Sequence, residues 1–320
     1  MIEIAFIIRL PFLLLIVFLF VSCDQSNQVD HPVPDIPSGR ILWAEVDVPE
    51  RGSLNGYASN GAQIYQERCV TCHGRRGLGD GTAAAYMITK PRNFSTGEYK
   101  LHSTADFPSG EDLYRTVTAG IPAFGMPSYE YLSPQDRWAV VDYIQGLGQS
   151  EYAARLESDA VKEELGLNLA RLDSESRVQH WEELIKIHKE TAGYAEEQFQ
   201  AGVALQIPPT RPRTEKSLKR GKKLYLNYGC AVCHGYTGGG YDSSAEAMTD
   251  NQGRVIRPRD FREGAWYFKA GNRREDIMRV IVGGMPGTPM PSLDLGEEEN
   301  GKLWDLAYYV EYLAGLKEEK

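Results

Sequence analysis

Cysteine is scarce in this chain of 320 residues, and each of the five cysteines has an identifiable place. Cys23 ends an apolar N-terminal segment, and the other four form two pairs, Cys69/Cys72 and Cys230/Cys233. Because no cysteine is left over, the sequence excludes a disulfide framework and a separate catalytic thiol.

Excess basic charge is also missing. The chain has 35 Lys and Arg against 44 Asp and Glu, a formal net charge of −9. Such a chain offers no basic field for nucleic acid, so we expect no nucleic-acid partner. The hydrophobic content of 42% and the charged content of 25% are ordinary for a globular protein. Strand patterns are weak throughout, so we expect a mainly α fold.

A long apolar run occurs only at the N-terminus, from Leu10 to Val21, and it has the length of a signal-peptide core. The Ser22-Cys23 step that follows resembles a bacterial lipoprotein processing site, which implies cleavage before Cys23 and lipidation of its sulfur. The alternative is an uncleaved anchor over residues 4–21, near the lower limit of a bilayer span. Both interpretations predict an exported bacterial protein held at the periplasmic or outer face of the cytoplasmic membrane.

Two parts of the chain repeat one another, because five landmarks recur in the same order. The first copy has Gly61 with Tyr65, Cys69-Val-Thr-Cys72-His73, Pro91-Arg92-Asn93-Phe94, Gly120 to Met126-Pro-Ser, and Trp138 with Tyr143. The second copy has Gly221 with Tyr225, Cys230-Ala-Val-Cys233-His234, Pro258-Arg259-Asp260-Phe261, Gly284 to Met290-Pro-Ser, and Trp304 with Tyr309. We therefore predict two copies of one domain.

The expected organisation follows from this repeat. We predict a signal over 1–23, an N-terminal linker over 24–54, a first domain over 55–150, a bridge over 151–214 and a second domain over 215–320. Within the domains, the patterns predict helices over 61–68, 111–119, 219–227 and 274–282.

Two further helices are predicted outside these ranges. Ser133 is a plausible N-cap for a helix that starts at Pro134, runs through Leu147 and ends near Gly148. In the bridge, one apolar stripe is predicted from residues at helical spacing, and a stiff Pro-rich spacer follows it. The stripe consists of Trp181, Leu184, Ile185 and His188.

The two Cys-x-x-Cys-His motifs carry the chemistry. Each Cys pair can form thioethers to the vinyl groups of a haem, and the adjacent His then ligates the iron. A thioredoxin-like pair needs a βαβ setting, which is absent, and the pairs lie too far apart for a zinc ribbon. The motifs therefore predict two covalent haem c groups, with His73 and His234 as proximal ligands.

The sixth iron ligands are predicted from the repeat. Met126 and Met290 occupy equivalent positions, each before Pro-Ser, and a thioether suits haem iron. Met285 is the competitor in the second copy, but its repeat partner is Ile121, which cannot ligate. The other methionines and histidines lack equivalents, and we expect them to pack or to face solvent: Met87, Met248, Met278, His31, His102, His180 and His188.

At these residues the chain resembles the class I c-type cytochromes, in a diheme arrangement of two fused domains. The resemblance covers residues 55–149 and 215–316. It implies that Gly61 and Gly221 allow the N- and C-terminal helices of each domain to cross closely. It also implies tyrosine pairs at each crossing, Tyr65/Tyr143 and Tyr225/Tyr309. Arg92 and Arg259 stand where the family holds haem propionates, which suits bidentate recognition of carboxylates.

The expected function is single-electron transfer between respiratory redox partners, rather than an enzyme activity. Two haems that each have His and Met ligands leave no open iron for a substrate. The alternative is a diheme peroxidase or a haem-based sensor, either of which needs one exchangeable sixth ligand. The protein is expected to act as a tethered carrier or as a subunit of a membrane respiratory complex.

Overall fold

The computed structural model of the chain describes residues 41–51, 60–240, 248–264, 268–271, 273–296 and 299–316. All of these belong to one compact unit, Val33–Lys320. The predicted signal, Cys23 and His31 lie outside the described residues. No helix within the described ranges has the length and apolarity needed to cross a membrane.

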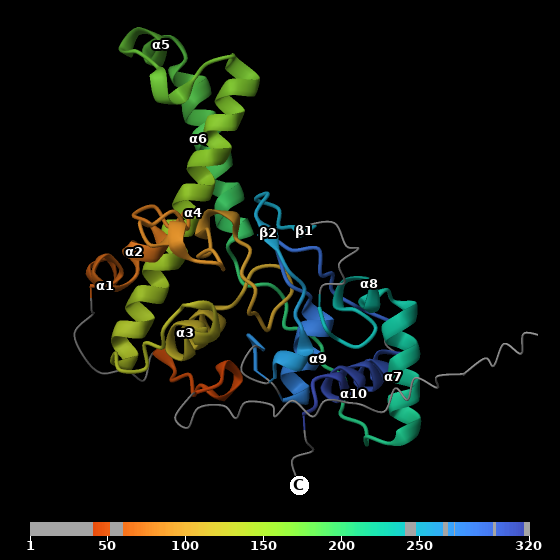
Figure 1. Cartoon of the computed structure of the whole chain (residues 1–320). Helices are drawn as coiled ribbons and strands as arrows, with labels where there is room; N and C mark the ends of the chain where they lie inside the picture. Colours follow the sequence, from red (N-terminus) through yellow and green to blue (C-terminus); the bar gives the residue numbers. More distant parts are fainter. Residues whose placement is uncertain are drawn as a thin grey trace, which may run out of the picture. The chain divides into compact units, whose positions relative to one another are not determined.

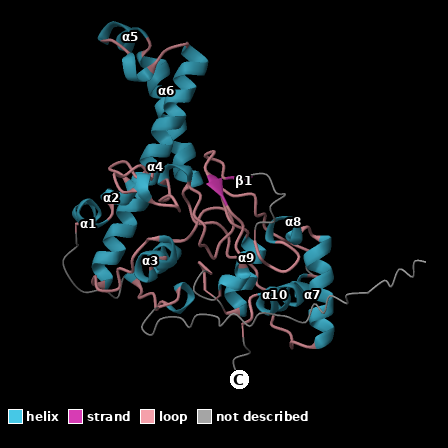
Figure 2. Cartoon of the chain, viewed as in Figure 1, coloured by secondary structure: helices cyan, strands magenta, loops and turns pink. Residues whose placement is uncertain are grey.

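Helices dominate the described part of the chain, which confirms the predicted mainly α fold (Figure 2). The strands there are β1 (Met248–Thr249) and β2 (Val255–Ile256), which pair antiparallel with Met248 opposite Ile256. The α-helices are α1 (Gly61–Arg68), α2 (Val70–His73), α3 (Gly110–Ala119), α4 (Pro134–Leu165), α5 (Ser174–Gln179), α6 (Trp181–Gln198), α7 (Glu215–Asn227), α8 (Cys230–His234), α9 (Arg274–Gly283) and α10 (Leu303–Leu313). Short 3₁₀ helices are η1 (Trp43–Glu45), η3 (Ala84–Tyr86), η4 (Phe94–Thr96), η5 (Pro122–Phe124), η6 (Leu169–Arg171), η7 (Phe261–Glu263) and η9 (Asn300–Lys302).

The helix order repeats in the same way as the sequence. Helices α1, α2, α3 and the start of α4 form the first repeat, and α7, α8, α9 and α10 form the second (Figure 1). Each repeat encloses an apolar core, one with Tyr65 and Trp138 and the other with Tyr225 and Trp304. The start of α4 is as predicted, because Ser133 accepts a hydrogen bond from the amide of Asp136.

The first and last helices of each repeat cross at a glycine. A Cβ atom added to Gly61 would lie 2.0 Å from the carbonyl oxygen of Ala139, and one added to Gly221 would lie 1.9 Å from that of Asp305. Only glycine allows backbones to approach so closely, so the structure confirms the close crossing that the resemblance implied. The expected tyrosine pairs are also present, with ring centroids 5.2 Å apart for Tyr65/Tyr143 and 5.4 Å for Tyr225/Tyr309.

The predicted end of α4 near Gly148 is wrong. The helix continues to Leu165 and ends at Gly166, which has a φ of 66°. A glycine inside a helix costs only about 1 kcal/mol relative to alanine, and good helix formers follow Gly148. Gly148 serves packing instead, since a Cβ there would lie 2.8 Å from the carbonyl oxygen of Phe94.

The bridge is helical as expected, but the predicted apolar stripe is wrong at its two ends, because Trp181 and His188 are exposed while Leu184 and Ile185 are half-buried. Trp181 is 61% exposed, and the buried positions of α6 are Ile187, Thr191 and Ala195, spaced four residues apart. This face packs along the extension of α4, and Figure 1 shows the two helices side by side with α5 at the turn between them. The buried face of α6 is decided by this extension of α4, which lies beyond the helix end predicted near Gly148.

Candidate functional site

The two Cys-x-x-Cys-His segments lie on short helices, with Cys69 as the N-cap residue of α2 and Cys230 as the first residue of α8. The four cysteines are free and partly buried. Burial, with a smaller contribution from Cys72, raises the pKa of the Cys69 thiol to about 11.

Each motif histidine is oriented by a main-chain carbonyl. Nδ1 of His73 lies 3.2 Å from the carbonyl oxygen of Arg92, and Nδ1 of His234 lies 3.1 Å from that of Arg259. Burial lowers the pKa of both rings, which favours the neutral imidazole. A neutral ring that donates through Nδ1 presents Nε2 as the ligating atom, as metal-binding histidines require.

A phenylalanine stacks on each of these histidines. The ring centroids are 4.7 Å apart in both pairs, Phe94 with His73 and Phe261 with His234, and the rings are inclined by 19° and 17°. The repeated Pro-Arg-x-Phe segment therefore holds the histidine by one carbonyl and one ring. From the sequence, only the arginine side chains of this segment were predicted to have a role, although the repetition of Phe94 and Phe261 was a visible signal.

The two methionine loops have the same backbone hydrogen bond. The amide of Ile121 donates to the carbonyl oxygen of Met126 at 2.8 Å, and that of Met285 donates to Met290 at 3.1 Å. This pairing supports the repeat alignment, in which Met285 corresponds to Ile121 and Met290 to Met126. The assignment of Met126 and Met290 as iron ligands stays a prediction.

One cavity gathers the predicted residues of the first repeat. It has an empty volume of about 1320 Å³, part of which opens to solvent, and Cys69, Cys72, His73 and Met126 all line it. Met87 lines it too, although we expected this residue to pack or face solvent. Apolar surface makes up most of the lining, which is typical of cofactor pockets.

Two buried donors in this cavity fit an anionic group. Nη1 of Arg92 and the hydroxyl of Tyr99 have no hydrogen-bond partner within the described residues. Burial, followed by repulsion from Arg254, lowers the pKa of Arg92. An unmade buried hydrogen bond costs about 1–3 kcal/mol, so carboxylate oxygens such as those of haem propionates would suit these atoms. The cavity therefore fits a haem.

Arg259, the repeat equivalent of Arg92, has a different setting. Its guanidinium pairs with Glu263 at 3.0 Å and lies 4.6 Å from the ring centroid of Phe124 in the methionine loop of the first repeat. The propionate roles of Arg92 and Arg259 stay predictions, and the geometry favours Arg92.

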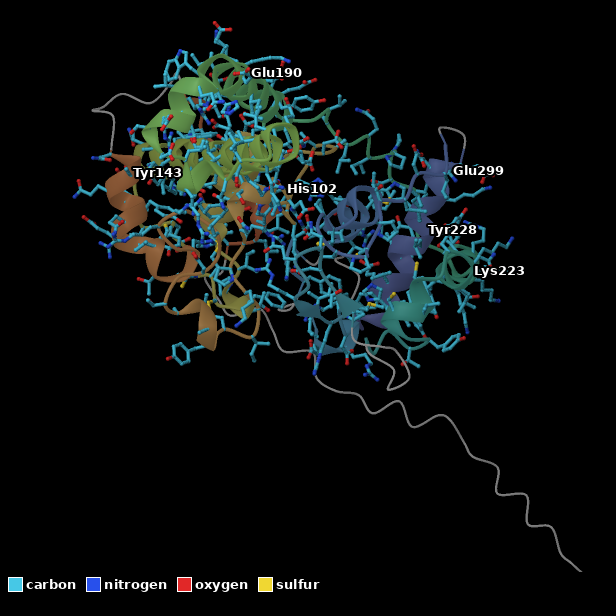
Figure 3. All side chains as sticks on the ribbon, turned by 90° about the horizontal axis from the view of Figure 1, so that it is seen from above. His102, Tyr143, Glu190, Lys223, Tyr228 and Glu299 are labelled. Atoms are coloured by element: carbon cyan, nitrogen blue, oxygen red, sulfur yellow. The ribbon has the colours of Figure 1, made fainter. Side chains whose placement is uncertain are left out.

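The other described histidines do not line this cavity. His102, labelled in Figure 3, is 5% exposed, and its Nδ1 lies 2.6 Å from the carbonyl oxygen of Thr104. His188 pairs with Glu157, and His180 stands at the N-terminus of α6. Among the described histidines only His73 lines the cavity.

Comparison with known proteins agrees with the geometry. The sequence model of the cytochrome c family matches residues 58–148 and 218–314, and each segment contains one complete set of the landmarks described above. A search of curated proteins found no match.

A solved structure extends the comparison. A chain of the reducing HAO-like protein complex of Kuenenia stuttgartiensis is 28% identical to this one, with a TM-score of 0.61. The match covers 84% of this chain and 99% of that chain, so it reaches beyond the two family segments. With more than half of its length matched, this chain belongs to the cytochrome c family, as two tandem cytochrome c-like domains that imply covalently bound c-type haem.

Proposed function

We propose that this protein is a class I diheme cytochrome c that passes single electrons between respiratory redox partners. One haem is attached at Cys69 and Cys72, and the other at Cys230 and Cys233. Each iron has His and Met ligands, His73 with Met126 and His234 with Met290. The observation that carries this proposal is the convergence of Cys69, Cys72, His73 and Met126 on one cavity in the first repeat.

The duplicated histidine environment supports a second haem of the same type. His234 has the same carbonyl contact and the same stacked phenylalanine as His73, and Met290 closes the same loop as Met126. Met and His ligands together raise the reduction potential of a haem and leave no position for a substrate. This arrangement favours a carrier over a diheme peroxidase or a haem-based sensor.

The location and the partner are part of the same proposal. The N-terminal segment supports export and attachment to the outer face of the bacterial cytoplasmic membrane, through lipidated Cys23 or an uncleaved anchor. The solved relative belongs to a reducing HAO-like protein complex. This supports a role for the protein as an electron-transfer partner or as a subunit of a redox protein complex.

Methionine ligation is tested by Met126→Leu and Met290→Leu, with Met87→Leu and Met285→Leu as matched controls. A Met–iron bond gives a weak near-infrared absorption band in the oxidised protein. We expect each of the first two variants to lose about half of this band, because each removes one of two thioether ligands. The controls should keep the whole band. The measurement is the near-infrared spectrum, with a pyridine haemochrome assay to confirm two haems per chain in every variant.

Loss of the band in Met285→Leu but not in Met290→Leu would move the sixth ligand of the second haem to Met285. Loss in Met87→Leu but not in Met126→Leu would do the same for the first haem. High-spin spectral features in the wild-type protein would contradict the proposal that the protein is an electron carrier.

A further inference from the structure

The second repeat contributes a lysine to the cavity of the first. Lys269 follows η7 in the second repeat and lines the cavity that contains His73 and Met126. Its Nζ lies 4.4 Å from the ring centroid of Phe124, which stands two residues before Met126. The cavity is therefore built from both repeats.

Lys269 has cations for neighbours. The charges that act on it most are those of Lys100, Arg259 and Arg92. Burial, followed by repulsion from these groups, lowers its pKa well below the ordinary value. Within the described part of the chain no carboxylate pairs with Lys269, and Glu263 already pairs with Arg259. A half-buried cation in this setting is stabilised by an anion.

A propionate of the attached haem is an anion that can lie in this region of the cavity. Thioethers to Cys69 and Cys72 fix the vinyl edge of the haem, and its two propionates leave from a different edge of the ring. Five cations line the cavity: Arg68, Lys90, Arg92, Lys100 and Lys269.

Exposure separates these five cations. Arg68 is exposed next to Cys69, and exposed Lys90 donates to the carbonyl oxygen of Ala84 at 2.8 Å. Arg92, Lys100 and Lys269 are more buried and remain for the propionates.

Lys269 is also the repeat equivalent of Lys100. The ring of Tyr99, just before Lys100, stacks on Phe94 with centroids 6.0 Å apart. The ring of Phe268, just before Lys269, stacks on Phe261 at 5.9 Å. Both lysines line the first cavity, so the copy in the second repeat reaches across to its neighbour.

We propose that Lys269 binds a propionate of the haem attached at Cys69 and Cys72, so that the second repeat completes the site of the first haem. This inference rests on the proposed function. A positive charge beside the propionate favours the reduced haem, because reduction adds one negative charge. Lys269 therefore raises the potential of the first haem and joins the two repeats through it.

The test compares Lys269→Met with Lys269→Arg and with the control Lys189→Met, which removes an exposed lysine of α6 outside the cavity. All are made in the full-length protein with both haems. Potentiometric titration should show Lys269→Met shifting one haem to lower potential by about tenfold in its equilibrium constant, ~59 mV for one electron. Resonance Raman spectra should show the propionate bending modes of one haem displaced. Lys269→Arg should keep both signals close to those of the wild-type protein, and Lys189→Met should change neither.

The same substitution in a Cys69→Ser/Cys72→Ser variant shows which haem the shift in potential belongs to, because only the second haem remains in that variant. Lys269→Met should leave that remaining potential unchanged. A persisting shift would mean that Lys269 serves the second haem and would overturn the inference. Unchanged potentials and propionate modes in the diheme Lys269→Met protein would overturn it as well, and this comparison does not depend on the Cys variant folding. If the inference fails but Lys269→Met still has two haems and the full Met–iron band, the proposed function is unaffected.

Discussion

Gly61 shows how one residue fixes the geometry of a repeat. It lies where α1 crosses α4, and a side chain there would meet the backbone of Ala139, which no rotamer change can relieve. The hydroxyl of Tyr65, one turn further along α1, donates to the carbonyl oxygen of Gly74 at 2.7 Å and so holds the residue after His73. The helix crossing thereby positions the histidine.

Replacement of this glycine should therefore destabilise the protein. We expect Gly61→Ala to lower the free energy of unfolding by about 1–3 kcal/mol, as overpacking of a close contact does. The matched control is Gly146→Ala, at an exposed position of α4 where an added Cβ has nothing within 4 Å. That control should raise stability by about 0.4–1 kcal/mol, because alanine restricts the unfolded chain. Urea denaturation followed by circular dichroism measures both, and equal effects of the two substitutions would contradict the close crossing.

At this scale the sequence predicted most of the candidate site. The repeat and the resemblance placed His73, Met126 and the two cysteines, and the structure brings all four to one cavity. The carbonyl of Arg92 was missed, because a main-chain acceptor leaves no mark on residue identity. Lys269 was missed because its role depends on how one repeat meets the other.

Helices α4 and α6 show the limit of periodicity at the scale of elements. The spacing of apolar residues predicted a helix in the bridge correctly, but several faces of that helix are partly apolar. The buried face is decided by the partner helix, and the part of α4 that contacts α6 lies beyond Gly148, where the sequence predicted the helix to end. Ile187 is 2% exposed on that face, whereas Trp181 is 61% exposed.

This difference gives a matched pair of substitutions in one helix. Ile187→Ala should lower the free energy of unfolding by about 2–5 kcal/mol, because it leaves a cavity between α6 and α4. Trp181→Ala, although it removes a larger side chain, should change it by no more than about 0.5 kcal/mol. Thermal unfolding of both variants, followed by circular dichroism, measures the difference. A larger loss for Trp181→Ala would restore the stripe expected from the sequence.

For the whole molecule, the order of landmarks predicted two copies of one helical domain, and the cytochrome c family matches both. The contact between the two copies could not be predicted from the repeat. Sequence similarity between the copies contains no information on how they pack against each other. In the structure, Arg259 and Lys269 of the second repeat lie on Phe124 of the first. The methionine loop of the first repeat is thus in contact with the second repeat.

The most direct test of the account is a carbon monoxide titration of the fully reduced protein, after the haem content has been counted. Carbon monoxide binds only to reduced haem iron with an open or weakly held sixth position. With Met126 and Met290 in place, we expect two haems per chain and no change in the Soret band at neutral pH. Carbon monoxide binding to one haem of the intact protein would contradict a pure electron carrier and would favour a peroxidase or a sensor.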